Sequence, residues 1–353
     1  MANWKYRLQK HRTKIRIAGS VLLFLVAVIL AYLLLLRDKW DILDFGREHT
    51  LAEHVVSGDV SGKLSVFKTE SMEKTFTTSL PKDRYLYAPG SSYDSFFAYN
   101  GTDVYRLNVE DGKIENEGVI AKITVEGAEG FRTDGKNIAV LSNDGQTITF
   151  YYENDGAMET EIIELQEKIH DYAVIDGRLY YAVGTELVLF HSGEETSIDL
   201  GDVTNHITKF QDKILIQNDF GSGLNNSILL TLEPENLLIV ELEETESGET
   251  VLIPSDEGDE RFYTMHYVSG KEPFYFMHEW ELDRDHLVKN KNLAIRVPVR
   301  EDGVVYNHHT AVASKGYLYV HFNDKLKIFD IRSQDWHSEV SDLYEHFAMP
   351  VLD

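Results

Sequence analysis

The chain has 353 residues, with 59 Asp or Glu against 34 Lys or Arg, and a formal net charge of −25 at pH 7. This excess of acid repels phosphate polymers, so we expect no nucleic-acid binding by the acidic part of the chain. The sequence contains no Cys, which excludes disulfides, thiol nucleophiles and zinc sites built on thiolates.

Residues 1–16 hold six Lys or Arg and no acid, and residues 17–36 form an uncharged apolar stretch. A helix that rises about 1.5 Å per residue needs about twenty residues to cross a hydrocarbon core of about 30 Å. We therefore predict one N-terminal transmembrane α-helix over residues 17–36, which makes the lipid bilayer the first expected partner. A cleavable signal peptide is the alternative, but its apolar region is usually only about 7–15 residues long.

The positive-inside rule places the basic arm of residues 1–16 in the cytoplasm and the chain after residue 36 on the other side of the membrane. We predict a juxtamembrane linker over residues 37–51 and an extracytoplasmic domain over residues 52–353. Exported domains of animals and plants usually contain disulfides. A Cys-free exported domain therefore favours a single-pass protein of a bacterial cell membrane, with a Gram-positive bacterium as the expected source.

Residues 130–165 alternate short apolar runs with three Asp-Gly pairs, at 134–135, 144–145 and 155–156. Asp-Gly is a strong hairpin signal, because tight hairpin turns need positive φ angles, which Gly adopts freely and Asp tolerates. The pattern predicts a four-stranded antiparallel meander with strands over 130–133, 137–142, 146–152 and 158–165. The same arrangement returns downstream, with strands predicted over 170–175, 178–183, 186–191, 196–200 and 317–322.

The spacing of the first turn in each unit indicates a repeat. Turns at Gly135, Gly177, Asp212, Gly270 and Gly316 are separated by 42, 35, 58 and 46 residues. These intervals are near the roughly 40–50 residues of a propeller blade. Because radial packing covers both faces of each small sheet, we predict an all-β fold, a β-propeller of about seven blades, with six or eight possible. The first and last strands could join to complete one blade.

Two segments resemble the outer-strand signature of quinoprotein-like and Kelch-like propellers, in which an apolar strand ends in an acid and a turn. They are VYRLNVEDGK, from Val104 to Lys113, and LKIFDIRSQDW, from Leu326 to Trp336. The resemblance implies blade architecture only, since propellers serve binding, scaffolding and catalysis alike. The Trp-Asp signal of WD40 blades is missing, because the one Trp-Asp pair, Trp40-Asp41, lies at the predicted membrane exit.

A segment near residues 241–260 carries nine acids and no base, and it interrupts the repeat. Such a segment could hold calcium, which takes about 6–8 oxygen ligands, but it lacks the Asp-x-Asp-x-Asp-Gly order of a calcium loop. Runs of like charge are typically solvated. We interpret the segment as a solvated acidic insertion in the propeller.

Eight of the fourteen His lie in the C-terminal quarter of the chain. His278-Glu279 with His286 has the wrong spacing for a zinc peptidase, because that motif places its two His four residues apart on one helix face. His308 and His309 would point to opposite faces of a strand and could not share a metal directly. We therefore assign no catalytic residue, no metal ligand and no cofactor-binding residue, and we expect no cofactor.

These observations predict a membrane-anchored extracytoplasmic β-propeller that acts as a protein-interaction or assembly scaffold in a bacterial cell envelope. The expected partner is a protein of the membrane or envelope, in which the chain is a subunit or accessory factor of a complex. A propeller that binds or hydrolyses envelope glycan or peptide is the alternative. A cofactor-dependent oxidoreductase is less favoured, and an enzyme is less expected than a scaffold.

Overall fold

The computed structural model describes residues 48–352, apart from 83, 91–92, 155, 202, 211–212, 221–223, 232–239, 243–249, 256–260, 269–273, 284–285, 299–310, 323 and 345. Within that part of the chain, no helix is long and apolar enough to cross a membrane. The predicted span at residues 17–36 lies outside the described residues, as do the basic arm and residues 37–47 of the predicted linker.

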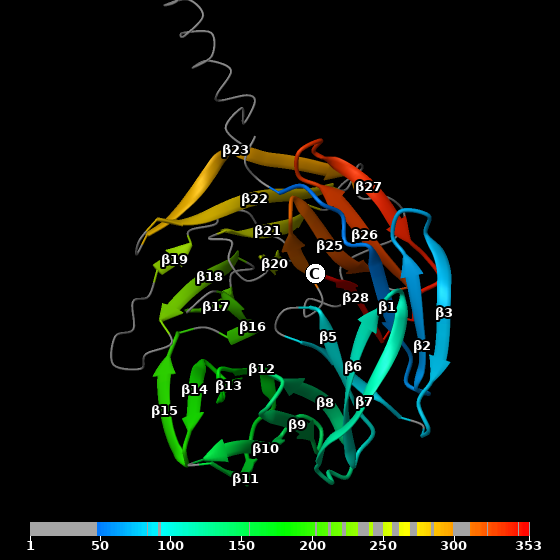
Figure 1. Ribbon diagram of the computed structural model, residues 1–353. Helices are drawn as coiled ribbons and strands as arrows, with labels where there is room; N and C mark the ends of the chain where they lie inside the picture. Colours follow the sequence, from blue (N-terminus) through cyan, green and yellow to red (C-terminus); the bar gives the residue numbers. More distant parts are fainter. Residues whose placement is uncertain are drawn as a thin grey trace, which may run out of the picture. The chain divides into compact units, whose positions relative to one another are not determined.

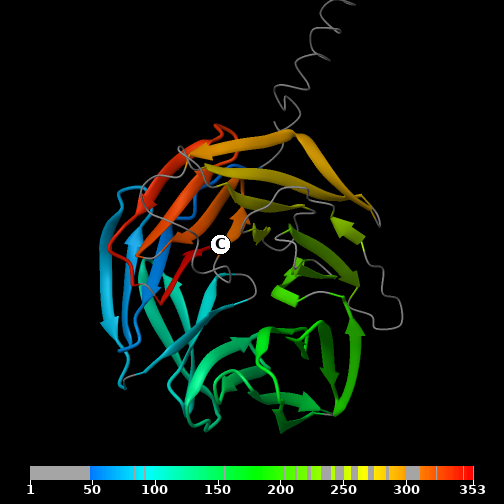
Figure 2. The same ribbon diagram turned by 180° about the vertical axis from the view of Figure 1, so that it is seen from behind.

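The described residues from His49 onward form seven four-stranded antiparallel sheets, which we call blades 1 to 7. The blades stand around a central axis, with one edge strand of each blade nearest that axis (Figure 1, and from behind in Figure 2). This arrangement is a β-propeller, so the predicted all-β fold is confirmed, and the number of sheets lies within the expected range of six to eight.

Blade 1 combines the last strand of the chain with the first three: β28 (Phe347–Val351), β1 (His54–Gly58), β2 (Lys63–Lys68) and β3 (Glu73–Ser79). Blade 2 contains β4 (Leu86–Pro89), β5 (Ser95–Tyr99), β6 (Asp103–Glu110) and β7 (Lys113–Lys122). Blade 3 contains β8 (Ala128–Thr133), β9 (Ile138–Ser142), β10 (Thr147–Asn154) and β11 (Ala157–Glu164). Blade 4 contains β12 (Ile169–Ile175), β13 (Arg178–Val183), β14 (Glu186–His191) and β15 (Glu194–Asp199).

Blade 5 contains β16 (Val203–Phe210), β17 (Lys213–Phe220), β18 (Leu224–Thr231) and β19 (Val240–Leu242). Blade 6 contains β20 (Thr250–Pro254), β21 (Arg261–Val268), β22 (Phe274–Asp283) and β23 (His286–Pro298). Blade 7 contains β24 (Val312–Ser314), β25 (Tyr317–Phe322), β26 (Lys325–Asp330) and β27 (Asp335–Val340). In each blade the first strand named is the inner strand. From blade 1 to blade 7 each inner strand contacts the inner strand of the next blade, and blade 7 contacts β28 through β25.

The Asp-Gly pairs form the turns that the sequence predicts. Asp176 and Gly177 have φ angles of 50° and 79°, and Asp144 and Gly145 have φ angles of 55° and 79°. Positive φ at both central residues is the backbone of the tight hairpin turn that matches strand twist. The four strands of the predicted meander over residues 130–165 are confirmed as β8 to β11.

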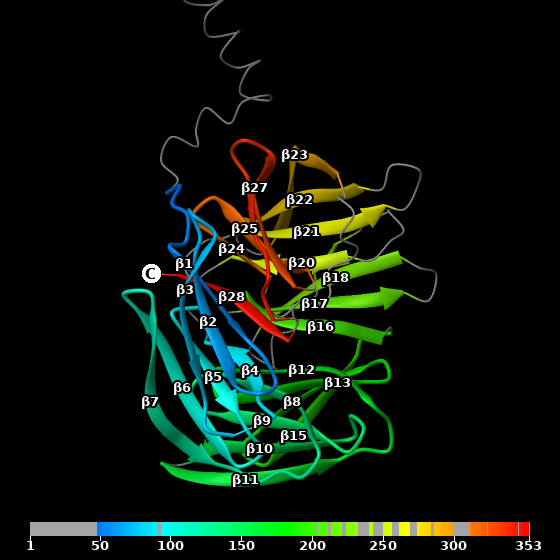
Figure 3. The ribbon, with the colours of Figure 1, turned by 90° about the vertical axis from the view of Figure 1, so that its right-hand side faces the viewer.

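The two ends of the propeller meet in blade 1, where β28 pairs antiparallel with β1 (Figure 3, β28 in red beside β1 in blue). Val56 lies opposite Met349 in this pairing, and all five residues of β28 are buried. β28 also contacts β25 of blade 7 and β4 of blade 2. The last strand of the chain therefore closes the ring, as the sequence allowed.

The core consists of apolar clusters between neighbouring blades rather than one central core. Between blades 3 and 4, Phe150 and Tyr152 of β10 lie edge-on to Phe190 of β14, with ring centroids 5.9 Å and 5.7 Å apart. Burial of large aromatic side chains stabilises this packing by about 1.5–3 kcal/mol each. Blades 3 and 4 thus bury their apolar faces against each other.

Blade 6 corrects the predicted repeat. The predicted turn at Gly270 lies outside the described residues, and its place in the chain is between β21 and β22, the second and third strands of the blade, rather than after the inner strand. The inner strand is β20, which lies inside the segment expected to be an acidic insertion. After Thr250 its residues VLIP are apolar, and Leu252 and Ile253 are fully buried. Part of residues 241–260 is therefore blade rather than loop.

The antiparallel strands give the propeller two faces. On one face, which we call the turn face, lie the turns after each inner strand, such as 134–137 in blade 3 and 176–177 in blade 4. On the other, the crossover face, lie the connections from one blade to the next, such as 165–168. The N-terminal segment of the domain attaches at the turn face, because the backbone N–H of Thr50 donates to the carbonyl of Lys315, 3.1 Å away, in the first turn of blade 7.

Candidate functional site

The inner strands of blades 3, 4 and 5 share an irregularity close to the crossover face. The register shifts between Ala128 and Gly130 in β8, between Ile169 and Asp171 in β12, and between Thr204 and His206 in β16. Such bulges bend a strand and turn a side chain to a new direction, and they are common near functional sites. The residues that follow these three bulges are the starting point for a site.

Five residues around the bulges form what we call the inner-strand cluster: Gly130, Arg132, Asp171, Tyr172 and His206. Gly130, Asp171 and His206 occupy equivalent positions, each directly after the bulge of its strand. Asp171 and His206 are 35 residues apart in the sequence, the same interval that separates the turns at Gly177 and Asp212. The repeat interval therefore carries a signal for this equivalence, although neither residue was among the candidate site residues predicted from the sequence.

Gly130 makes room for the hydroxyl of Tyr172 in the next blade. A Cβ atom on Gly130 would lie 2.5 Å from the Tyr172 hydroxyl oxygen and 3.2 Å from Cβ of Leu141. Tyr172 is buried, and this burial raises the pKa of its hydroxyl, so the group is neutral at physiological pH. The absence of a side chain at position 130 thus lets the ring of Tyr172 reach β8.

Arg132 extends from β8 over the face of the same tyrosine ring. The guanidinium carbon lies 5.4 Å from the ring centroid of Tyr172, within the range of a cation–π interaction. Nη1 donates to the carbonyl of Phe131 at 3.0 Å, and the buried Nε has no hydrogen-bond acceptor. Among the described residues, no carboxylate forms an ion pair with Arg132, although the side chain is only half-buried.

Asp171 links blades 4 and 5 at the position that Gly130 occupies in blade 3. Its Oδ2 accepts the backbone N–H of Ile207 at 2.8 Å and lies 3.3 Å from Nδ1 of His206. Asp171 and His206 are both buried, with 6% and 4% of their surface exposed. A buried carboxylate is stable only with such donors, so the pair fixes the inner strands of the two blades against each other.

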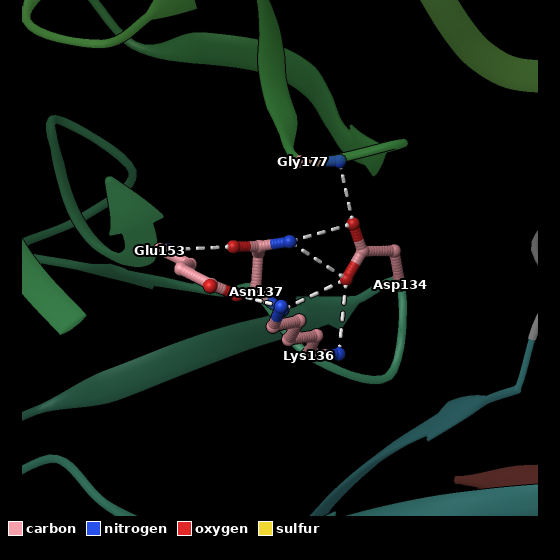
Figure 4. Close-up of polar contacts among 5 residues, drawn as sticks. All are labelled: Asp134, Lys136, Asn137, Glu153 and Gly177. Carbon is pink, nitrogen blue, oxygen red and sulfur yellow. Dashed lines mark hydrogen bonds and ion pairs between the residues drawn. The ribbon is translucent and has the colours of Figure 1, made fainter. Parts of the chain in front are cut away.

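A second polar network lies on the turn face between blades 3 and 4 (Figure 4). Asp134 accepts the backbone N–H of Gly177 in the next blade at 2.7 Å, and the N–H groups of Lys136 and Asn137 in its own turn. The amide of Asn137 donates to Asp134 and accepts the backbone N–H of Glu153 at 2.9 Å. Lys136 forms an ion pair with Glu153. These groups bond to one another within and between the two blades, so we interpret this network as structural.

The residues considered from the sequence as metal ligands do not form a site in the described part of the chain. His278 and Glu279 are buried in β22, and Glu279 accepts a hydrogen bond from the hydroxyl of Tyr263 at 2.9 Å. Adjacent strand residues point to opposite faces, so these two side chains diverge. No group of three or more His, Asp or Glu is placed to hold a metal within the described residues. His308 and His309 lie outside the described residues.

The comparisons with known proteins agree on the fold. No protein-family model matches the chain, and no curated protein matches it. A functionally unknown protein from Desulfotomaculum acetoxidans has a similar structure, with a TM-score of 0.54, 12% identity, and coverage of 83% of this chain and 97% of that one. At this identity the likeness shows the β-propeller class alone.

Two further solved structures carry different names. A putative 6-phosphogluconolactonase from Bacteroides fragilis has a TM-score of 0.50 and 15% identity, and the match covers 84% of this chain and 97% of that chain. Hsv2p from Kluyveromyces lactis has a TM-score of 0.50 and 12% identity, with coverage of 70% and 74%. The structural neighbours are β-propellers of varied function, so the function must be argued from this chain's own residues.

Proposed function

We propose that the chain is a membrane-anchored, extracytoplasmic β-propeller that acts as a protein-interaction or assembly scaffold in a bacterial cell envelope. The basic arm and the uncharged stretch of residues 17–36 support the anchor and its orientation. The proposed activity is geometric: the propeller presents a broad, rigid surface to a membrane or envelope protein and holds that partner in place. On this proposal the chain is a subunit or accessory factor of a membrane complex.

The attachment of residues 49–52 to blade 7 is the observation that carries the proposal. The backbone N–H of Ala52 donates to the hydroxyl of Tyr319 at 2.7 Å, and Nε2 of His49 lies 3.0 Å from Oδ1 of Asp330. Only residues 37–48 separate the proposed membrane span from this fixed point, and a chain of that length reaches at most about 43 Å. A propeller held this close to a membrane is suited to a partner that lies in or on that membrane.

Affinity capture of the full-length protein from detergent-solubilised membranes tests the proposal. We expect one membrane or envelope protein at a stoichiometric ratio. A matched control is a secreted form in which a cleavable signal peptide replaces residues 1–36, since it should lose enrichment at the membrane while keeping the propeller. Recovery of the full-length protein alone would contradict the scaffold function. Protection of residues 49–352 from protease on intact cells, under conditions that cut known surface proteins, would contradict the location.

A second candidate function is a propeller that binds envelope glycan or peptide. Arg132 favours it, because this guanidinium lies on an inner strand, is half-buried, and has no carboxylate partner among the described residues. A cation held in that state is suited to an anionic ligand. Peptide binding by the full-length protein is the measurement that tests this candidate. Binding that is lost when Arg132 is substituted would support it over a scaffold without a ligand.

A further inference from the structure

We propose that Arg132 binds the carboxylate group of a small ligand, such as a peptide with a free C-terminus, where the inner strands of blades 3 and 4 meet. The site would be built from the guanidinium of Arg132 on β8 and the ring of Tyr172 on β12, which support each other at 5.4 Å. This inference does not depend on the membrane anchor or on a protein partner, because it concerns residues within the propeller alone.

The ring of Tyr172 holds the guanidinium in place before any ligand arrives. Gly130 allows this, since a Cβ atom there would lie 2.5 Å from the tyrosine hydroxyl oxygen and would push the ring away. A guanidinium held over the face of an aromatic ring can still donate two parallel N–H groups to one planar carboxylate. Less conformational freedom is then lost when the ligand binds.

Two other described cations of blades 3 to 5 already have carboxylate partners, in contrast to Arg132. Lys136, four residues further along, pairs with Glu153, and Lys209 pairs with Asp176 at 3.0 Å. Arg132 has only the carbonyl of Phe131, and its buried Nε has no acceptor. A buried donor without an acceptor is unfavourable, so a ligand that supplies an acceptor to this guanidinium gains free energy on binding.

The repeat shows that a cation is not required here for packing. Arg132 lies two residues after Gly130 in β8. The equivalent positions, two residues after Asp171 and His206, are Ala173 in β12 and Thr208 in β16. Ala173 is buried, and Thr208 is half-buried. Small or polar side chains therefore suffice for the same place in blades 4 and 5, and Arg132 is a feature of blade 3 rather than of the blade design.

The charge of the domain decides between the anions that a guanidinium can bind. Residues 37–353 carry 59 Asp or Glu against 28 Lys or Arg, so an approaching polyanion is repelled along its whole length. A single carboxylate meets the least repulsion and matches the fork of one arginine. Asp171, the carboxylate beside Tyr172 in the chain, does not compete for Arg132, because it contacts Ile207 and His206 of blade 5.

Isothermal titration of the full-length protein in a non-ionic detergent tests the inference, with trialanine, its C-terminal amide and inorganic phosphate as probes. We expect one trialanine per chain, at least about tenfold weaker binding of the amide, and weaker binding of phosphate. Arg132→Gln should weaken trialanine binding at least about tenfold, and Arg132→Lys should bind with intermediate affinity, because lysine keeps the charge without the fork.

Arg106→Gln is the matched control, because this substitution removes the same charge from another blade. Arg106 lies in β6 and pairs with Glu117 at 3.4 Å. This variant should bind trialanine as the unsubstituted protein does. Thermal unfolding of each variant shows whether the fold is intact, and Arg132→Lys remains informative if Arg132→Gln is unstable. No binding of any probe, equal binding of trialanine and its amide, tighter binding of phosphate, or equal affinities with and without Arg132 would each overturn the inference. None of these outcomes depends on whether affinity capture finds a protein partner.

Discussion

Asp134 of blade 3 accepts a hydrogen bond from the backbone N–H of Gly177 in blade 4, with 2.7 Å between Oδ2 and the nitrogen (Figure 4). The two residues are 43 positions apart, and each belongs to the turn that follows an inner strand. The same carboxylate accepts two backbone N–H groups of its own turn. One side chain thus shapes its own hairpin and fixes the next blade against it.

We expect Asp134→Ala to lower the free energy of unfolding by about 2–3 kcal/mol, because hydrogen bonds to a charged acceptor contribute more than neutral ones. Asp134→Asn should cost less, since its amide oxygen still accepts a hydrogen bond. Urea unfolding followed by circular dichroism measures both. Glu126→Ala, which removes an exposed carboxylate, should leave stability within about 0.5 kcal/mol of the unsubstituted protein.

We expect Gly130→Ala to destabilise the propeller, because the new methyl group would lie 2.5 Å from the hydroxyl oxygen of Tyr172. The cost should be about 1–3 kcal/mol, the usual range for overpacking. Tyr172→Phe removes that oxygen, so the double variant should recover part of the loss. The recovery is incomplete because Cβ of Leu141 still lies 3.2 Å away. Strictly additive effects in this double-mutant cycle would contradict the contact.

The attachment of the N-terminal segment should weaken in acid. Burial raises the pKa of Asp330, but hydrogen bonds from His49 and from the backbone N–H groups of Ser333 and Arg332 outweigh it, so the pKa lies below its ordinary value of 3.8. A carboxyl group with a lowered pKa in the folded state stabilises the fold above its unfolded pKa. That contribution is lost as the pH falls through the folded value, because the unfolded state binds more protons.

Thermal unfolding of Asp330→Asn and of the unsubstituted protein, from about pH 6 to about pH 3, measures this loss. The difference between their midpoints should be constant above the ordinary carboxyl pKa and should shrink below it. Asp324→Asn, an exposed site in the turn between β25 and β26, provides the control and should show no such narrowing. A difference that is independent of pH would mean that Asp330 does not hold the segment through its charge.

Ring closure by β28 should be visible in a graded pair of substitutions. Met349 is fully buried between blades 1 and 2, in one cluster with Leu64 and Phe96. We expect Met349→Ala to lower the free energy of unfolding by about 2–5 kcal/mol, since it removes buried atoms and leaves a cavity. Met349→Leu conserves volume and should cost less than about 1.5 kcal/mol. Equal, small effects in urea unfolding would contradict a closing role for this strand.

Much of the strand layout was readable from local pattern. The predicted strands over residues 178–183, 186–191 and 317–322 match β13, β14 and β25 at both ends. Period-two alternation and Asp-Gly turns act between residues close in sequence, so they need no knowledge of the rest of the fold. Blade 6 was misread because its apolar inner strand, β20, stands inside an acidic run and has no Asp-Gly turn to mark its end.

The candidate site was not readable in this way. Arg132, Asp171 and His206 stand in three different blades, and nothing near any of them in sequence names its partner. Two of the missed features had a weak signal: the 35-residue interval between Asp171 and His206 repeats the interval between two turns. Gly130, Asp171 and His206 occupy the same position of the repeat but have different side chains. A repeat therefore predicts where a residue lies in the blade better than it predicts the function of that residue.

The sequence by itself determined that the domain is built from small antiparallel sheets, because alternation, turn residues and their spacing are local properties that each segment carries alone. It also determined where the charge lies. Only the tertiary structure decided that β28 completes blade 1, that Gly130 leaves space for Tyr172, and that Arg132 has no carboxylate beside it among the described residues. These contacts join residues far apart in the chain, and they form only when the blades pack around one axis and bury their faces against each other.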